Sequence, residues 1–310
     1  MGKKVGVLFG QERNFPYALA GEVKRVSGGK VDGEPVLLGA LRMDQPPPYD
    51  LILDRISHEV PYYRTLLKHA AFAGTQVVNN PFWFSADDKY FGNLVAIQSG
   101  VAVPRTILMP HKNHPPNTSS DSFSNLRYPL PWDEIFEYLG FPIFLKPAYG
   151  GGWKDVSKVD GPMEFFEAYG RSRDLCMMAE EAIDFTEYFR IYVLGRERVH
   201  IMRYNPKAPH HERYVKNAPP IDRGLREKLE RDSLALCRAL GYDFNTVEFA
   251  VRDGIPYAID FTNPCPDAEP ASVGEENFAW VLRNAAEFLV QRVKNPRPLE
   301  LTGTWPGHAR

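Results

Sequence analysis

The stretch TVEFAVRDGIPYAIDFTNP, residues 246–264, predicts two β-strands joined by a tight turn. Apolar and polar residues alternate in both halves, which is the two-residue period of a strand. If the turn has three residues, 252–254, Glu248 and Asp260 lie on one face as diagonal neighbours, roughly 7–8 Å apart at the backbone. If the turn is Asp253-Gly254 alone, the register shifts by one residue and the two acids face opposite ways.

Two carboxylates that lie this close repel each other unless a cation sits between them. Oxygen ligands of this kind suit a hard cation. Asn263 stands at the end of the second strand, before Pro264, and its amide oxygen can complete the set. The pattern therefore predicts a metal site at Glu248, Asp260 and Asn263. The alternative is an exposed sheet face on which scattered acids hold no ligand.

A glycine-rich loop follows another predicted strand. In FLKPAYGGGWKDVSKV, residues 144–159, Lys146 ends the strand and Gly150-Gly151-Gly152 comes shortly afterwards. Glycines let backbone N–H groups approach phosphate oxygens closely, and a lysine adds a positive charge. A second lysine, Lys89, stands at the head of a predicted helix. The loop lacks the G-x-x-x-x-G-K-[ST] pattern of a P-loop, and a flexible turn is the alternative interpretation.

The first part of the chain has a different pattern. Strands expected at 4–9, 36–38, 49–54 and 75–78 alternate with helices, which predicts a small α/β layer with a parallel sheet. Residues 110–131 are rich in Pro, Ser and Asn, and we expect them to form a surface loop or linker.

The composition narrows the class of protein. The 310 residues are 44% hydrophobic and 25% charged, as in an ordinary globular protein. The formal net charge of −2 gives no general attraction to nucleic acid or to anionic lipid. The cysteines form no C-x-x-C pair, which is typical of thiols in a reducing compartment, and no apolar run approaches the ~20 residues that cross a bilayer. We therefore expect a cytoplasmic protein with no nucleic-acid or membrane partner.

The order of the motifs resembles that of the ATP-grasp superfamily, particularly the branch of glutathione synthetase, D-alanine–D-alanine ligase and the ribosomal-protein glutamate ligases. The two lysines and the glycine-rich loop precede MMAEEAI (177–183), an acid, and a hairpin that ends in D-x-x-N-P. The resemblance implies an α/β fold: an N-terminal Rossmann-like pre-ATP-grasp layer, followed by a two-lobed α+β grasp with antiparallel sheets. The implied domains are the pre-ATP-grasp layer at 1–84, the central lobe with flap and linker at 85–184, and the C-terminal lobe with the metal site at 185–310.

The resemblance also implies roles for single residues. The cofactor-binding set is Lys89 and Lys146 at the ATP phosphates, Gly150, Gly151 and Gly152 in the flap, Glu180, Glu181 and Ile183 at the adenine, and Glu187 at the ribose. The ligands of Mg2+, or of Mn2+ in its place, match Glu248, Asp260 and Asn263, although the family more often has Glu at the position of Asp260. The catalytic set that meets the phosphate or the acyl substrate is Arg190, Arg203 and Arg213, the last followed at a looser spacing by Asn217. Surface arginines are the alternative for Arg190 and Arg203, and a solvated strand end is the alternative for Glu180 and Glu181.

The function implied by the resemblance is an ATP- and Mg2+-dependent carboxylate–amine ligase, which forms an amide or peptide-like bond through an acyl phosphate. Small-molecule carboxylates and amines are the expected partners, and the resemblance also points to a homodimer. Two alternatives stay open. One is a kinase of the same fold that phosphorylates a small polyol, and the other is a non-catalytic ATP-binding regulatory protein.

Overall fold

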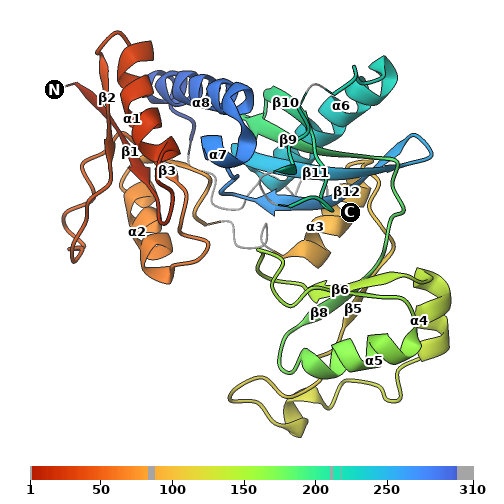
Figure 1. The fold of residues 1–310 in the computed structure, drawn as a ribbon. Coiled ribbons are helices and arrows are strands. Elements are labelled where there is room, and N and C mark those ends of the chain that lie inside the picture. Colours follow the sequence, from red (N-terminus) through yellow and green to blue (C-terminus); the bar gives the residue numbers. More distant parts are fainter. Residues whose placement is uncertain (1, 83–87, 210–211, 217, 299–310) are drawn as a thin grey trace.

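The computed structural model describes residues 2–82, 88–209, 212–216 and 218–298. Within these residues, three four-stranded sheets follow one another along the chain (Figure 1). The first sheet is parallel and the other two are antiparallel. This mixture of helices with one parallel and two antiparallel sheets confirms the fold class that the sequence predicted.

The N-terminal sheet has the strand order β2-β1-β3-β4. Its elements are β1 (Lys3–Leu8), α1 (Phe15–Val26), β2 (Val31–Pro35), β3 (Leu51–Asp54), α2 (Pro61–Phe72) and β4 (Gln76–Val78). The strand expected at 36–38 is wrong, because β1 pairs with the preceding residues instead. Gly33 weakens the strand pattern in the sequence, yet it lets β2 pass beneath α1, where a Cβ would meet Ala20 O at 2.3 Å.

The middle sheet has the order β5-β8-β6-β7. Its elements are β5 (Thr106–Met109), α4 (Trp132–Leu139), β6 (Ile143–Pro147), β7 (Ser157–Val159), α5 (Pro162–Arg171) and β8 (Met177–Glu181). The expected loop at 110–131 contains a 3-10 helix at Ser120–Phe123 and is otherwise irregular. Both α4 and α5 pack on this sheet around Phe165, Leu139 and Leu145, which are at most 1% exposed.

The C-terminal sheet has the order β10-β9-β11-β12. Its strands are β9 (Glu187–Leu194), β10 (Arg198–Arg203), β11 (Phe244–Arg252) and β12 (Ile255–Asn263). One face packs on α3 (Lys89–Gln98) and α6 (Arg223–Leu240), and the other faces α7 (Pro270–Val273) and α8 (Glu275–Lys294). Helix α3 therefore packs on the C-terminal sheet, although it precedes the middle sheet in the sequence.

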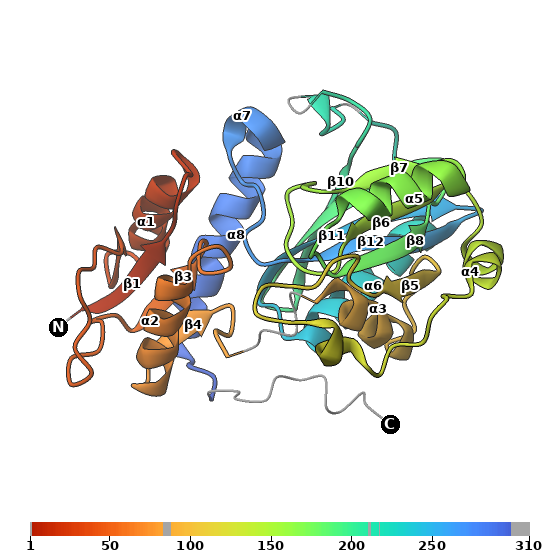
Figure 2. The same ribbon diagram turned by 90° about the horizontal axis from the view of Figure 1, so that it is seen from below.

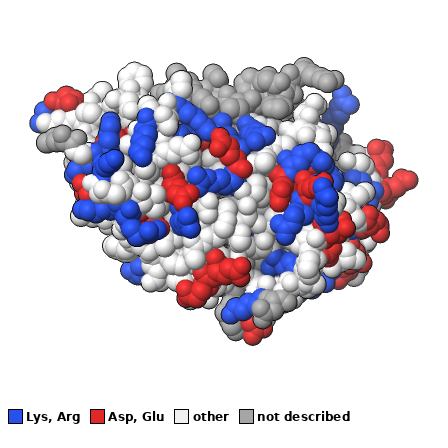
Figure 3. All heavy atoms as spheres, turned by 90° about the horizontal axis from the view of Figure 1, so that it is seen from above, with Lys and Arg blue, Asp and Glu red and all other residues white. Residues whose placement is uncertain are grey.

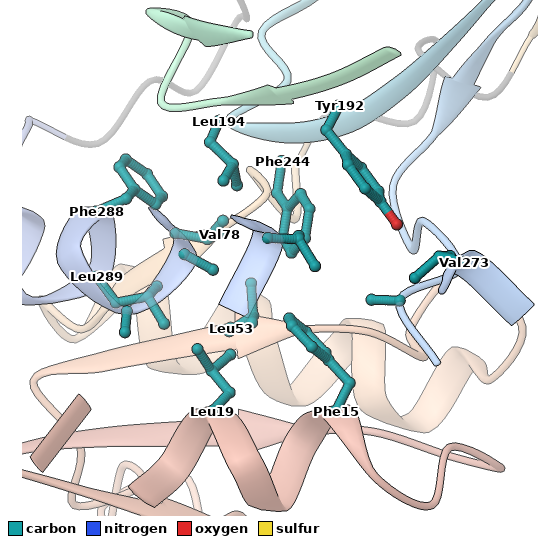
Figure 4. Packing of buried hydrophobic residues seen from close by; sticks show 14 of the residues in the cluster. Phe15, Leu19, Leu53, Val78, Tyr192, Leu194, Phe244, Val273, Phe288 and Leu289 are labelled. Atoms are coloured by element: carbon teal, nitrogen blue, oxygen red, sulfur yellow. The ribbon is translucent and has the colours of Figure 1, made fainter. Parts of the chain in front are cut away.

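A single hydrophobic cluster joins the N-terminal layer to the C-terminal sheet. Phe15 of α1 and Leu53 of β3 point toward Phe244 of β11, and Phe288 of α8 packs beside them (Figure 4). Phe15, Leu53 and Phe244 are each no more than 1% exposed. Because α8 contacts both α1 and β9, it fixes the two parts of the molecule to each other.

The two antiparallel sheets lie one over the other, as the two ribbon views agree (Figures 1 and 2). The chain crosses between them through residues 182–186, after β8 ends and before β9 begins. The space between these sheets contains the candidate site. The domain boundaries at 84/85 and 184/185 stay a prediction.

The surface carries charges of both signs. On the face shown in Figure 3, basic and acidic side chains are interspersed. Among the described helices, none combines the length and the apolar character needed to cross a membrane.

Candidate functional site

The hairpin of β11 and β12 has a two-residue turn. Arg252 pairs with Ile255, and the turn residues Asp253 and Gly254 have φ angles of 53° and 74°. Asp-Gly is the sequence that favours such a turn, because both of its central residues need a positive φ. The three-residue turn taken as the basis for placing the acids is therefore wrong.

A β-bulge compensates for the shorter turn. Phe249 pairs with Ala258, but the next pair is Glu248 with Asp260, so Ile259 is an extra residue on β12. The extra residue cancels the one-residue shift that the turn introduces. Glu248 and Asp260 consequently lie directly opposite each other on one face, which is the arrangement that the metal-site prediction requires.

A cavity of about 360 Å³ lies between the two antiparallel sheets, beside this pair of acids. Its lining includes most residues to which the sequence assigned a cofactor or metal role, namely Lys89, Lys146, Gly150, Gly151, Gly152, Glu180, Glu181, Ile183, Glu248 and Asp260. These residues come from both sheets and from the start of α3. The fold thus brings together side chains that are far apart in the sequence.

Two lysines of the cavity, Lys146 and Lys89, are each paired with an acid. Lys146 Nζ donates to Glu180 Oε1 at 2.9 Å and to Ile259 O at 3.4 Å. Glu180 is only 2% exposed, so the lysine neutralises a buried carboxylate. Lys89 Nζ donates to Asp260 Oδ1 at 3.1 Å. In this state Lys146 neutralises Glu180 and Lys89 neutralises Asp260.

Glu248 is held from two sides. Tyr188, on the neighbouring strand β9, donates its hydroxyl to Glu248 Oε2 at 2.7 Å. Arg190 Nε lies 3.5 Å from Glu248 Oε1, and Arg190 Nη1 donates to the Tyr214 hydroxyl at 3.1 Å. The carboxylate is therefore fixed with its oxygens in defined positions.

The two acids differ in proton affinity. Burial raises the pKa of Glu248 above its usual value; Arg190 opposes this effect and the charge of Asp260 adds to it. Burial alone would also raise the pKa of Asp260, but Lys89 and Lys146 outweigh it and hold that pKa below its usual value. Burial likewise opposes the charge of Lys89, yet Asp260 raises the pKa of Lys89. Asp260 and Lys89 therefore form the charged pair of the site, and Glu248 is the acid that ionises with more difficulty.

Asn263 lies behind Arg190 rather than in the cavity lining. It pairs with Thr246, on the same sheet face as Glu248. With its amide oriented to suit its neighbours, Asn263 Oδ1 accepts from Arg190 Nη2 at 3.1 Å and from Thr246 Oγ1 at 2.9 Å. Arg190 thus links Asn263 to the pair of acids.

Three other predicted residues lie away from the cavity lining. On β9, Glu187 alternates with Tyr188, and so it occupies the opposite sheet face, where it is ion-paired with Arg203. Arg203 itself stacks over Phe189, with its Cζ 5.2 Å from the ring centre. Arg213 Nε donates to Ala208 O at 3.1 Å. The roles predicted for Glu187, Arg203 and Arg213 stay predictions, and Asn217 lies outside the described residues.

The glycine-rich loop is anchored at its base. Gly150 and Gly152 have φ angles of 88° and 72°, values that favour glycine. Just before them, Tyr149 donates its hydroxyl to Asp88 Oδ2 at 3.2 Å, and Lys89 N donates to Ala148 O at 2.9 Å. The base of the loop is therefore tied to the start of α3.

The sequence interpretation missed the tyrosines of this site. Tyr188 was detectable, because it stands two residues before Arg190 on the same strand face. Tyr149 gave no comparable signal, because its contact with Asp88 joins segments that are distant in the sequence.

The donor atoms of the cavity fit a magnesium ion better than zinc. Within the described parts of the chain, no three His, Cys, Asp or Glu side chains gather into a metal site. Glu248 and Asp260 provide two hard oxygen donors, and magnesium is usually held by one or two carboxylates together with water and phosphate oxygens. The pair of acids therefore suits a cation that is delivered with a phosphate ligand.

Comparisons with known proteins identify several relatives by sequence. No protein-family model matches the chain. Pyruvate carboxylase 1 of Caenorhabditis elegans is 29% identical over 179 residues, which cover 53% of this chain and 14% of that protein. A D-alanine–D-alanine ligase of Coprothermobacter proteolyticus is 27% identical over 228 residues, or 67% of this chain and 68% of that protein. The chain thus spans only a small part of the carboxylase.

Solved structures match nearly the whole chain. The D-alanine–D-alanine ligase of Bacillus anthracis, complexed with ATP, superposes with a TM-score of 0.65 at 17% identity, covering 94% of this chain and 97% of that one. VanG D-Ala:D-Ser ligase of Enterococcus faecalis gives a TM-score of 0.67 at 15% identity, covering 94% and 100%. At these identities the likeness is one of fold.

Proposed function

Because the chain has the ATP-grasp fold that these neighbours share, we propose that it binds MgATP between its two antiparallel sheets and uses it to join a carboxylate to an amine. The observation that carries this proposal is the pairing of Glu248 with Asp260, at a cavity that also holds Lys89 and Lys146. The two acids would suit the metal ion of a metal–triphosphate ligand, and the two lysines would suit its phosphates.

Nucleotide binding would exchange the partners of these charges. In the structure Lys89 is bonded to Asp260, and Lys146 to Glu180. A triphosphate that enters with its cation offers both lysines a new anionic partner. The cation in turn would neutralise charge on the acids, including Glu248, whose pKa is raised by burial. Binding of metal and phosphate together would therefore give both the lysines and the acids a partner of opposite charge.

The proposed chemistry needs charge neutralisation more than a protein nucleophile. An amine does not displace an oxide from a carboxylate, but it does displace phosphate from an acyl phosphate. Transfer of the γ-phosphoryl group depends on in-line positioning and on compensation of charge at its oxygens. Magnesium, when held by Glu248 and Asp260, would supply part of that compensation. Lys89 and Lys146 would bind the phosphates, and Arg190 would orient Glu248.

The glycine-rich loop would exclude water from the cavity. Gly150, Gly151 and Gly152 line it on one side, and Trp153 and Tyr149 lie at the same border. An acyl phosphate reacts with water as well as with amines, and closure over it therefore favours ligation. The bond from Tyr149 to Asp88 leaves the base of the loop fixed while its tip moves.

The test is ADP release from the purified chain with MgATP and panels of carboxylic acids and amines, with hydroxylamine as a trap. Bicarbonate belongs in the panel because several relatives are carboxylases. One acid is expected to raise ADP release and to yield a hydroxamate. Glu248→Gln is expected to abolish both signals, whereas Glu230→Gln on α6, where the side chain is 43% exposed, is expected to leave them unchanged.

Two outcomes would contradict the proposal. ADP released with a polyol and no hydroxamate would indicate a kinase. Nucleotide-dependent thermal stabilisation without any turnover, and insensitive to Glu248→Gln, would indicate a regulatory protein that binds ATP without using it.

A further inference from the structure

A second cavity lies at the junction of the N-terminal layer and the C-terminal sheet. Its volume is about 250 Å³, and its lining shares no residue with that of the first cavity. The polar groups at its border come from four parts of the chain: Thr75, Gln76 and Asn80; Arg196; Asp243; and Arg292 with Arg297. No role in the proposed ligase reaction falls on this cavity.

Three guanidinium groups meet one carboxylate at its wall. The Asp243 side chain is 6% exposed, and its oxygens lie 3.1 Å from Arg196 Nε, 3.1 Å from Arg292 Nη2 and 3.0 Å from Arg297 Nη1. Asp243 is therefore shared among three guanidinium groups, two of which, those of Arg292 and Arg297, belong to the C-terminal part of the chain. Arg196 is also held by Gly241 O, which accepts from its Nη2 at 2.9 Å. Arg292, near the end of α8, and Arg297, just beyond it, border the cavity together with Arg196.

The arrangement is energetically unfavourable for the buried guanidinium of Arg292. Its side chain is 7% exposed, and within the part of the chain that the structure describes its Nη2 lies near Asp243 without a well-aligned hydrogen-bond acceptor. Burial lowers the pKa of Arg292, and although Asp243 opposes this, Arg297 and Arg196 lower it further. A buried cation without a full set of acceptors is unfavourable. An acceptor that enters the cavity would remove that cost.

We propose that this cavity binds a small phosphorylated ligand, whose phosphate group lies between Arg292 and Arg297. The planar fork of a guanidinium matches the oxygens of a phosphate, and a phosphate has enough oxygens to bind two forks at once, which the two oxygens of a single carboxylate do less well. The volume is slightly below that of the smallest common ligand pockets, about 300 Å³, and it accommodates a phosphate with a small organic part.

A ligand in this cavity would strengthen the junction. Gln76 of the edge strand β4 donates through Nε2 to Arg297 O at 2.9 Å and accepts from Arg297 N at 3.0 Å. Arg297 also donates to Asp243 at 3.0 Å, so one residue contacts both the N-terminal layer and the C-terminal lobe. Fixing its guanidinium would stabilise this contact.

The experiment is titration of the nucleotide-free chain with inorganic phosphate, followed by calorimetry and by the unfolding temperature, against sodium chloride at equal ionic strength. Phosphate is expected to bind the wild type and to raise its unfolding temperature. Arg297→Ala is expected to weaken binding at least ~tenfold, the effect of losing a charge-assisted hydrogen bond. The matched control is Arg283→Ala on α8, whose side chain is 71% exposed, and it is expected to bind phosphate as the wild type does.

Further variants and a second anion test whether phosphate binds at this cavity. Phosphate binding that is lost in Lys146→Ala and kept in Arg297→Ala would place the anion in the first cavity and overturn the proposal. Asp243→Asn, which frees guanidinium donors, is expected to tighten phosphate binding; weaker binding there would contradict the assignment. Citrate that binds as tightly as phosphate would refute the preference for a tetrahedral anion. Arg297→Lys keeps the charge without the fork, and is expected to bind more weakly than the wild type even if Arg297→Ala does not fold.

Discussion

Replacing Tyr188 with phenylalanine removes the hydroxyl that donates to Glu248 Oε2 at 2.7 Å and leaves the ring in place. The tyrosine is 8% exposed and borders the first cavity. A hydrogen bond to a charged acceptor contributes about 1.5–3 kcal/mol, and we expect the free energy of unfolding to fall by that amount when Glu248 is ionised. The control is Tyr17→Phe, whose side chain is 58% exposed and whose replacement should change stability by less than about 0.5 kcal/mol.

The effect of Tyr188→Phe depends on pH with a defined sign. The pKa of Glu248 is already raised by burial, and the Tyr188 bond favours its ionised form. Removing the bond raises that pKa further, so the destabilisation is complete above the pKa of the folded state and shrinks below it. A divalent cation needs the ionised carboxylate, and the acidic limb of magnesium-dependent nucleotide binding is therefore expected to move to higher pH.

Urea unfolding at several pH values measures the first effect, and calorimetry with magnesium and a non-hydrolysable ATP analogue measures the second. If Tyr188→Phe keeps the wild-type stability at mildly alkaline pH and the wild-type pH dependence of nucleotide binding, the hydrogen bond from Tyr188 does not stabilise the ionised form of Glu248.

Three other changes test separate parts of the site. Lys146→Met leaves Glu180, which is 2% exposed, without its cation, and should lower the free energy of unfolding by about 3–5 kcal/mol; adding Glu180→Gln should restore stability in urea but not nucleotide binding in calorimetry. Arg190→Ala should weaken nucleotide binding at least ~tenfold and Arg203→Ala less than about twofold, since they lie on opposite sheet faces; equal losses would contradict that placement. Burial lowers the pKa of His200, so the neutral imidazole contributes stability above about pH 6.5, and this contribution is lost as the pH falls. His200→Gln should therefore make the urea unfolding midpoint depend less on pH. An unchanged pH dependence would contradict the burial of the imidazole.

The hairpin of β11 and β12 shows which features of the site could be predicted from sequence patterns and which could not. Alternation identified both strands and the two acids, but alternation assumes an uninterrupted register. The actual Asp253-Gly254 turn would have separated the acids, and an extra residue at Ile259 brings them back together. A bulge depends on how the finished sheet twists and packs, and the local sequence does not display it. The prediction that both acids lie on one face was therefore correct, although the three-residue turn on which it was based was wrong.

The parallel sheet of the N-terminal layer was predictable from local patterns, whereas the order of the lobes was implied by the resemblance. The boundaries of single strands were less so, because Gly33 hides β2 in the sequence while making room for α1. Resemblance placed Glu187 and Arg203 at the site, yet on β9 and β10 their side chains share the face opposite to Arg190. The cluster around Asp243 was invisible, since its arginines come from a hairpin turn, from α8 and from the segment after it.

Crystals grown with manganese in place of magnesium, and with a non-hydrolysable ATP analogue, would locate the cation directly by its anomalous scattering. We predict a peak about 2 Å from a carboxylate oxygen of both Glu248 and Asp260, beside the terminal phosphate, with Lys89 turned from Asp260 toward the nucleotide. A cation bound by phosphate oxygens alone, with Lys89 still on Asp260, would contradict the account.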